Sequence, residues 1–349
     1  MPNDRAHGIQ IAYTCNAMAR VDIAVTLLIP KRWGVTDEDV RRYYVLDPSI
    51  RIRRVRVIDA SRVVPGYLSF FIRMVSFSVG ALWYAVTHTR KHDVVYTRGE
   101  MVFPLALCAW RYRLCWETHS KPSRVWLYRI VLRAVHEVVT VTHYYADELV
   151  NMFGVARGRV LVAPDAVDLV PFRTAYDQES TRATLGVSNN KTILLYTGSD
   201  QKWKGVDVLK EVVRHLPDTY LLVFVGQIHN DTGDDARFHY AGFQHHEDIP
   251  RWLAVADYLM LTGNINDTLS SRYTSPLKLF EYMASGKPII AFEIPSFREV
   301  LDDTTACFVP ATDPQRIALS IEALMPERAR QCAVQACRVV ERYTWDARA

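Results

Sequence analysis

A short segment in the second half of the chain has the residue types and spacing of a phosphate-binding loop. An apolar run ends at Gly198, and Lys204-Gly205 comes just before a helical pattern. Free backbone N–H groups at a helix start attract phosphate, Gly205 allows a close approach, and Lys204 adds a full positive charge. The alternative is an ordinary strand–loop–helix connection with solvated lysines, and this segment alone does not decide between the two.

A second segment, residues 271–288, supplies another helix start and a carboxylate. We expect Ser275 to be the N-cap and Pro276 the first helical residue, because serine and proline are favoured at these positions. The backbone from Ser275 to Leu277 then forms a second anion site. Glu281 follows on the same helix and can accept hydrogen bonds from two hydroxyl groups, as a ribose diol offers. The alternative for Glu281 is a surface glutamate.

Strand and helix patterns alternate along the whole chain, which is typical of parallel sheets covered by helices on both faces. The expected strands are 24–29, 52–57, 93–97, 114–117, 137–141, 160–162, 192–196, 220–225, 258–261 and 288–291. The expected helices are 8–19, 36–44, 66–86, 125–135, 145–153, 206–215, 249–256, 276–284 and segments from 314 onward. Doubly wound sheets of this kind bind ligands at the carboxyl ends of their strands.

Length and composition indicate two globular domains. The chain has 349 residues, of which 49% are hydrophobic and 23% charged. A polar stretch between Asp168 and Leu185 lacks apolar periodicity and predicts a linker, with domains at 1–170 and 171–349. The most apolar stretch, 66–86, is long enough to span a bilayer. Since Arg73 interrupts it and it lies within a domain, we expect a buried or interfacial helix there.

The net charge of +4 is unevenly distributed. Residues 1–170 hold 23 lysines and arginines against 15 aspartates and glutamates, whereas the remainder holds 19 against 23. The basic N-terminal domain indicates either peripheral contact with a membrane surface or scattered surface arginines. No nucleic-acid partner is expected. The six cysteines lack metal-ligand spacing, and no signal peptide precedes Arg5. We therefore expect reduced thiols, no metal and a location in the cytoplasm, either free or peripheral to the membrane.

Several motifs in order resemble the retaining GT-B glycosyltransferases of family 4, which include sucrose synthases and bacterial mannosyltransferases. The two main motifs are Tyr-Thr-Gly…Trp-Lys-Gly at 196–205 and Ser-Pro-Leu-Lys-Leu-Phe-Glu-Tyr-Met-Ala-x-Gly-Lys-Pro at 275–288. The others are Trp116-Glu-Thr-His119, Ala163–Asp168, Gly242-Phe243, Asp257–Leu261, Arg298–Leu301 and Tyr343-Thr-Trp345. Each motif is weak alone, but their order along nearly the whole chain is specific.

The resemblance implies a GT-B fold, with two Rossmann-like doubly wound domains facing each other across a cleft. The C-terminal domain would bind a nucleotide sugar, the N-terminal domain would be on the acceptor side, and the last helix would cross back to the N-terminal domain. The implied reaction transfers a hexose-type sugar from a nucleoside-diphosphate sugar to a lipid-linked or glycan acceptor. It would retain the configuration by front-face attack and need no metal or cofactor.

The resemblance also implies roles for individual residues. His119 would face the donor sugar, Lys204 would neutralise the diphosphate, and Glu281 would hold the ribose; these three are the expected catalytic residues. The expected donor-binding residues are Gly198, Lys204, Gly205, Gly242, Phe243, Tyr273, Ser275, Pro276, Leu277, Lys278 and Glu281. Gly242-Phe243 would contact the base, and Lys278 would assist at the phosphate. On the acceptor side the candidates are Gly8 and Glu117, which either orients His119 or is a core-edge carboxylate.

The sequence departs from the family pattern at three places. Tyr273 replaces the first of two glutamates normally eight residues apart, which contacts the donor sugar. Ser199 stands where an arginine often follows the strand glycine, so Lys278 or Lys202 must compensate for the lost charge. Residues 1–8 resemble the glycine-containing loop that follows the family's first strand, so we expect that strand to be missing through a misassigned or shortened start.

Two other functions remain open. Nucleotide-sugar 2-epimerases share this architecture, although the Trp-Lys-Gly motif argues against them. A catalytically degenerate subunit that only binds the donor would keep the same donor site, and Tyr273 together with the expected loss of a strand is compatible with such a protein.

Overall fold

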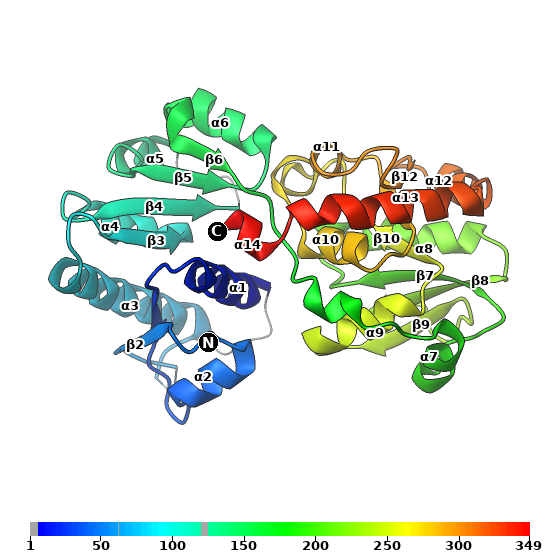
Figure 1. The fold of residues 1–349 in the computed structure, drawn as a ribbon, viewed down its shortest axis with the longest axis horizontal. Helices are drawn as coiled ribbons and strands as arrows, with labels where there is room; N and C mark the ends of the chain where they lie inside the picture. Colours follow the sequence, from blue (N-terminus) through cyan, green and yellow to red (C-terminus); the bar gives the residue numbers. More distant parts are fainter. Residues whose placement is uncertain (1–5, 62, 120–124) are drawn as a thin grey trace. The chain divides into compact units, whose positions relative to one another are not determined.

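The computed structural model describes residues 6–61, 63–119 and 125–349, and the chain divides into two compact units (Figure 1). Unit 1 comprises Met1–Ala163 together with Trp345–Ala349, and unit 2 comprises Pro164–Thr344. Both units are built from parallel β-strands connected by helices.

Unit 1 contains two separate parallel sheets among its described residues. One pairs β1 with β2, and the other has the strand order β3-β4-β5-β6; no described strand joins β1 to β3. The strands are β1 (Thr26–Pro30), β2 (Arg51–Val55), β3 (Val94–Arg98), β4 (Arg113–Thr118), β5 (Glu137–Thr140) and β6 (Val160–Val162). The helices are α1 (Ala6–Arg20), α2 (Asp37–Tyr44), α3 (Gly66–His88), α4 (Val102–Ala106), α5 (Val125–Val131), α6 (His143–Phe153) and α14 (Trp345–Arg348).

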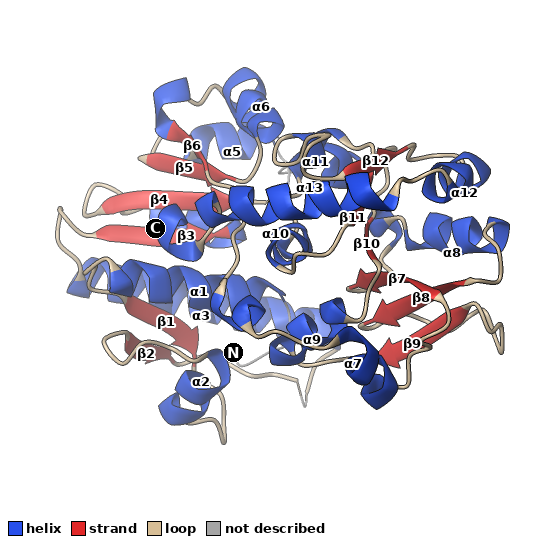
Figure 2. Ribbon diagram, turned by 45° about the vertical axis from the view of Figure 1, so that its right-hand side comes forward, coloured by secondary structure: helices blue, strands red, loops and turns tan. Residues whose placement is uncertain are grey.

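Unit 2 contains one six-stranded parallel sheet with the order β12-β11-β10-β7-β8-β9, drawn in red in Figure 2. The strands are β7 (Thr192–Thr197), β8 (Tyr220–Val225), β9 (Phe238–Gly242), β10 (Tyr258–Leu261), β11 (Ile289–Phe292) and β12 (Cys307–Val309). The helices are α7 (Gln178–Leu185), α8 (Val206–His215), α9 (Ile249–Ala254), α10 (Leu277–Ala284), α11 (Pro295–Arg298), α12 (Pro314–Glu322) and α13 (Pro326–Val339).

The strand order of unit 2 creates a natural ligand site. β7 lies between β8, which follows it in the chain, and β10, from which the chain continues to the opposite edge of the sheet. The connections leaving β7 and β10 therefore diverge, and ligands of open α/β sheets bind at the carboxyl ends of such strands. The segments that follow β7 and β10 contain residues 198–205 and 275–277, which the sequence predicted to bind anions.

The expected linker at 168–185 is wrong in its second half, which forms α7. Asp177 caps this helix by accepting from the N–H of Ser180. The helix packs through polar contacts, since Nη2 of Arg182 lies 2.8 Å from Oδ2 of Asp257 and Nε donates to the carbonyl of Val255. These contacts replace an apolar stripe, which explains why hydrophobic periodicity did not reveal the helix.

The ends of the units also differ from the expectation. Unit 2 begins at Pro164 rather than residue 171, because Val167 packs into its core and donates to the carbonyl of Tyr343. Gly8 lies in the first turn of α1 rather than in a loop, and residues 1–5 of the expected loop lie outside the described residues. Trp345, at the start of α14, belongs to unit 1, where its ring stacks on Tyr13.

Candidate functional site

Glycines hold the strand ends of unit 2 in close contact. A Cβ added at Gly226 would lie 1.9 Å from the carbonyl oxygen of Gly198, and one at Gly205 would lie 2.6 Å from that of Gly263. Gly205 also has φ +69°, a left-handed conformation that favours glycine. The loop after β7 is thus pressed against the end of β8, and the turn before α8 against the end of β10.

Lys204 lies in the turn that these glycines position. Its Nζ donates a 2.6 Å hydrogen bond to Oγ of Ser199, and its carbonyl accepts from Oγ1 of Thr262. Burial lowers the pKa of Lys204, and the charge of Asp200 opposes this shift. Lys204 is therefore a partly desolvated ammonium whose amino group contacts a neutral hydroxyl.

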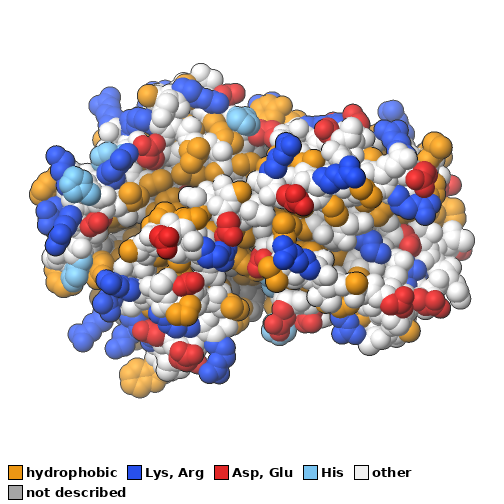
Figure 3. All heavy atoms as spheres, viewed as in Figure 1, with side chains coloured by type: hydrophobic (Ala, Val, Ile, Leu, Met, Phe, Trp, Pro, Cys, Tyr) orange, Lys and Arg blue, Asp and Glu red, His pale blue; other side chains and the backbone are white. Residues whose placement is uncertain are grey.

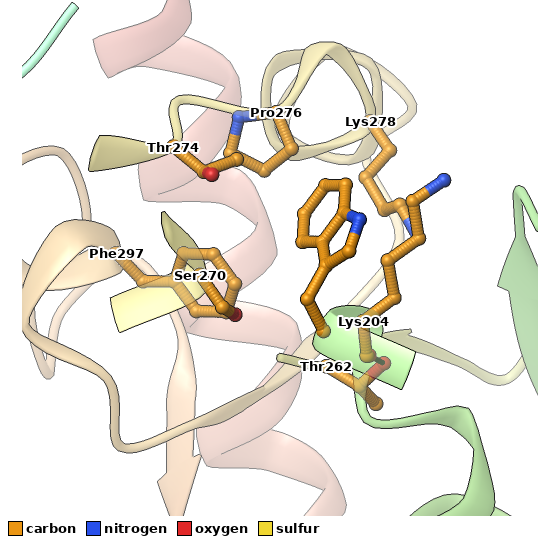
Figure 4. Close-up of a pocket in the computed structure, with 8 residues that line it drawn as sticks. Lys204, Thr262, Ser270, Thr274, Pro276, Lys278 and Phe297 are labelled. Carbon is orange, nitrogen blue, oxygen red and sulfur yellow. Dashed lines mark hydrogen bonds between the residues drawn. The ribbon is translucent and has the colours of Figure 1, made fainter. Parts of the chain in front are cut away.

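Lys278 enters the same pocket from the first turn of α10, and Figure 4 shows Lys204 and Lys278 reaching into one space from different elements. The Nζ of Lys278 is buried, has no hydrogen-bond partner among the described residues and lies 3.6 Å from the ring centroid of Tyr196. Burial and the charge of Lys204 hold the pKa of Lys278 well below its usual range, against the opposing charge of Glu281. Two cationic side chains without a carboxylate hydrogen bond thus lie together at the strand ends.

A pocket of about 30 Å³ lies around the two lysines. It is lined by Trp203, Lys204, Thr262, Ser270, Thr274, Pro276, Lys278 and Phe297. Lys202, the other cation expected to compensate for Ser199, is exposed.

The expected N-cap of α10 is wrong by one residue. Pro276 occupies the N-cap with φ −79° and ψ 135°, and the helix starts at Leu277. The hydroxyl of Ser275 accepts from the backbone N–H of Asp165 instead, at 3.1 Å. Since Ser275 accepts elsewhere and the proline side chain has no acceptor, no side-chain hydrogen bond caps the start of α10. Tyr273 is buried in the preceding π-helical turn, η6 (Leu269–Tyr273).

Glu281 is not a surface glutamate, because only 9% of the residue is exposed. Its Oε1 lies 3.6 Å from Nδ1 of His246, which follows β9. Phe243 is 46% exposed directly after β9, where Gly242 has φ +69° and its carbonyl accepts from the N–H of Gly226. A carboxylate and an exposed aromatic ring therefore follow strand ends of the same sheet as the lysines.

Unit 1 contains a separate charged cluster around Glu117 at the end of β4. Glu117 is 3% exposed and accepts from Nε2 of His119 at 2.7 Å. It also accepts from the hydroxyl of Tyr96 at 2.6 Å and from Nη2 of Arg348 at 2.8 Å. Arg98, opposite Glu117 on β3, lies 3.7 Å from its carboxylate and contacts Nε2 of His119.

This cluster keeps Glu117 ionised. Burial acts to raise the pKa of Glu117, but the hydrogen bond from His119 and the charges of Arg98 and Arg348 outweigh it and hold the pKa far below the usual range. The pairing of Glu117 with His119 was expected from the sequence, whereas its other partners were not. Arg98 could have been found from its place at the end of a predicted strand. Arg348 could not, because its contact spans 231 residues.

The structure brings Lys204, Pro276 and Lys278 to one pocket of unit 2, with Gly198 close to Lys278. His119, Glu117 and Gly8 belong to unit 1. Across the described residues, no three His, Cys, Asp or Glu side chains gather closely enough to hold a metal ion.

Comparison with known proteins gives matches along most of the chain. The family model described as glycosyltransferase family 4 matches residues 8–170, and the model described as glycosyl transferases group 1 matches residues 191–327. A D-inositol 3-phosphate glycosyltransferase of Xylanimonas cellulosilytica is 28% identical over 237 residues, which are 62% of this chain and 55% of that protein. The match thus spans about half the length of this curated relative.

Solved structures share the fold. HepE of Anabaena, in complex with UDP, has a TM-score of 0.74 at 15% identity, with 98% of this chain and 94% of that chain covered. Sucrose-phosphate synthase of Thermosynechococcus elongatus has a TM-score of 0.76 at 18% identity, with 99% and 91% covered. At these identities the likeness concerns the fold alone, and the prediction of two Rossmann-like α/β domains is confirmed.

Proposed function

We propose that this chain, which belongs to the group 1 glycosyltransferases of family 4, transfers a sugar from a nucleoside-diphosphate sugar to a lipid-linked or glycan acceptor. The observation that carries the proposal is the pair Lys204 and Lys278 at the carboxyl ends of the unit 2 strands. When the donor bond breaks, negative charge develops on the leaving diphosphate. Desolvated cations fixed at that place stabilise this charge more strongly than cations in water.

The remaining roles in this proposal are those that the resemblance to the family implies. The N–H groups at the start of α10 serve the phosphate groups, Glu281 accepts from the ribose hydroxyls, and Phe243 stacks on the base. His119 serves the sugar, and Glu117 orients its ring through the 2.7 Å hydrogen bond. Ser199 stands where relatives often have an arginine, and the candidates to replace that charge were Lys202 and Lys278. Since Lys202 is exposed, Lys278 supplies the charge in this proposal. The reaction proceeds with retention and without metal or cofactor in this proposal.

The test is a transfer assay with a panel of nucleotide sugars. UDP-glucose is the first donor, since HepE was solved with UDP, and D-inositol 3-phosphate is one acceptor, since the curated relatives are named for it. Transfer or donor hydrolysis supports the proposal. An altered sugar at carbon 2 without transfer indicates an epimerase, and nucleotide binding without any turnover indicates a donor-binding subunit.

Metal removal is expected to leave the activity intact. Lys204 and Lys278 would face the leaving group in place of a divalent cation, so excess EDTA should not reduce the transfer rate. The measurement is the initial rate with EDTA, with manganese added and with neither. Complete loss with EDTA and recovery with manganese would contradict the metal-free mechanism.

Glu281 and Tyr273 are expected to act on opposite ends of the donor. Glu281→Gln should weaken binding of free UDP by roughly tenfold or more, because a hydrogen bond to a charged group contributes about 1.5–3 kcal/mol. Tyr273→Phe should change the preference among donor sugars and leave the affinity for UDP unchanged. Calorimetry with UDP and competition between donor sugars measure the two effects. Loss of UDP affinity in the Tyr273 variant alone would reverse the proposed orientation of the donor.

The proposed location is cytoplasmic, with peripheral contact between the basic unit 1 and a membrane that carries the acceptor. On the face drawn in Figure 3, lysine and arginine side chains of unit 1 are interspersed with acidic ones rather than gathered in one field. Net charge alone therefore does not define a membrane-binding surface.

A further inference from the structure

Helix α3 of unit 1 buries its smallest residues and exposes its largest. Ser69, Ala81 and Ala85 are its buried residues, with 2–4% exposed. A Cβ at Gly80 would lie 2.3 Å from Cγ1 of Val55, so this side of the helix packs closely on β2. A helix that only covers a protein core shows the opposite arrangement, with large apolar side chains directed inward.

The outer side of α3 carries a continuous apolar stripe. It consists of side chains at four-residue intervals, Tyr67, Phe71, Val75, Val79 and Trp83, whose exposed fractions are 80%, 55%, 42%, 63% and 64%. Residues four apart are neighbours on a helix surface, and each step of four turns about 40°, so the five side chains follow a band that winds through about 160° around α3 from one end to the other. A contiguous stripe of this kind on a soluble domain marks an interaction surface, whereas single exposed apolar residues do not.

The packing of α3 against unit 1 favours a position along a membrane surface over one that spans the bilayer. The helix is long and apolar enough to cross a membrane. Its Gly80 side is locked against β2, however, and Nη2 of Arg73 lies 2.8 Å from Oδ1 of Asp59. Spanning would expose the Val55 side of the sheet and bury the Arg73 charge in lipid, which is costly.

The end of the helix carries the charge that complements anionic lipids. Arg90 and Lys91 are exposed immediately after α3, close in sequence to the exposed ring of Trp83. Trp110, 75% exposed, belongs to the segment that packs here, since Nε of Arg111 donates to the carbonyl of Val86. Tryptophan rings with adjacent cations are typical of the interface between lipid tails and headgroups.

We propose that the stripe Tyr67–Phe71–Val75–Val79–Trp83 of α3 lies in the plane of an anionic lipid bilayer and anchors unit 1 to its surface. The proposal deepens the membrane contact of the proposed function by assigning it to one helix face. It does not depend on the transfer reaction, because vesicle binding needs no donor or acceptor.

The test is co-sedimentation of the full chain with phosphatidylcholine vesicles, with and without phosphatidylglycerol. We expect binding to the anionic vesicles and a decrease of about tenfold or more in the double variant Phe71→Ser/Trp83→Ser, which loses two lipid-facing side chains. The matched control is Leu319→Ser/Val334→Ser, which removes two residues that are 60% and 54% exposed on α12 and α13 of unit 2. This control should bind like the wild type.

Charge gives a second, independent variant. Arg90→Gln/Lys91→Gln should weaken binding to phosphatidylglycerol vesicles, and added salt should weaken wild-type binding without abolishing it, because the apolar contribution is not screened. Thermal denaturation confirms that each variant is folded, and turnover with a soluble acceptor reports separately on the enzyme.

Three results would overturn the inference: no binding of the wild type to either vesicle, equal binding by the Phe71→Ser/Trp83→Ser variant, or self-association through α3 instead. Sedimentation equilibrium without lipid detects the last case, in which the wild type is dimeric and the α3 variant monomeric. If the protein transfers sugar but does not bind vesicles, the membrane proposal is wrong and the proposed function is unaffected. If it binds vesicles but does not transfer sugar, the proposed function is wrong and the membrane proposal is unaffected.

Discussion

Replacing Lys204 with alanine is expected to reduce donor affinity and turnover together, with kcat falling by about 10²–10³-fold, the loss found when one preorganised donor to a developing charge is removed. The effect is large because Lys204 is partly desolvated and, among the described residues, its Nζ donates to the neutral hydroxyl of Ser199 rather than to a carboxylate. Its charge is thus available to a diphosphate. Steady-state kinetics with a soluble acceptor and calorimetry with UDP measure the two losses.

The matched control for this experiment is Lys202→Ala. Lys202 lies two residues earlier in the same turn and is exposed, so its removal changes the net charge equally but should leave both constants nearly unchanged. Lys204→Ala should also remain folded, because the hydrogen bond from Thr262 goes to the backbone carbonyl of residue 204. Equal kinetics for wild type and Lys204→Ala would remove Lys204 from the donor site.

The sequence predicted the framework of unit 2 well because its signals are local. Strand β8 and helix α8 have the expected bounds, since each is a compact apolar or amphipathic run closed by polar residues. These features depend on neighbouring residues alone, so their patterns survive in a single sequence.

Features that depend on distant residues were missed. Ser275 has the sequence pattern of an N-cap, but in the fold its hydroxyl accepts a hydrogen bond from the backbone N–H of Asp165, which is 110 residues away. The pairing of Glu117 with Arg348 likewise needs the chain end to return to unit 1. In the sequence, Lys278 is indistinguishable from an exposed lysine in the first turn of a helix. Only its packing against Tyr196 in the fold shows that its amino group is buried.

Lys278→Met is expected to stabilise the fold while weakening donor binding. A buried amino group without a hydrogen bond costs about 1–3 kcal/mol, and methionine fills a similar volume without that cost. The same substitution removes one of the two cations that would face the diphosphate, so UDP affinity should fall by about tenfold or more. A higher free energy of unfolding together with a lower UDP affinity would identify Lys278 as a functional lysine. Loss of a structural lysine would instead lower the free energy of unfolding.

The pH dependence provides the last check on Lys278. Its pKa is lowered in the free protein by burial and by Lys204, with Glu281 opposing, whereas in an unfolded chain it is ordinary. Between these two pKa values the unfolded chain holds more protons, so this group makes stability rise with pH, and Lys278→Met should flatten that rise.

Diphosphate binding should reverse the shift, because two phosphate groups favour the charged amine. Binding of UDP is therefore expected to take up protons and to tighten as the pH falls through the same interval. Calorimetry of UDP binding in two buffers with different ionisation enthalpies measures this uptake, and the Lys278→Met variant corrects for protonation of the nucleotide itself. Identical proton uptake by wild type and variant would mean that Lys278 does not change its protonation on binding, and an unchanged UDP affinity in the variant would exclude it from the donor site.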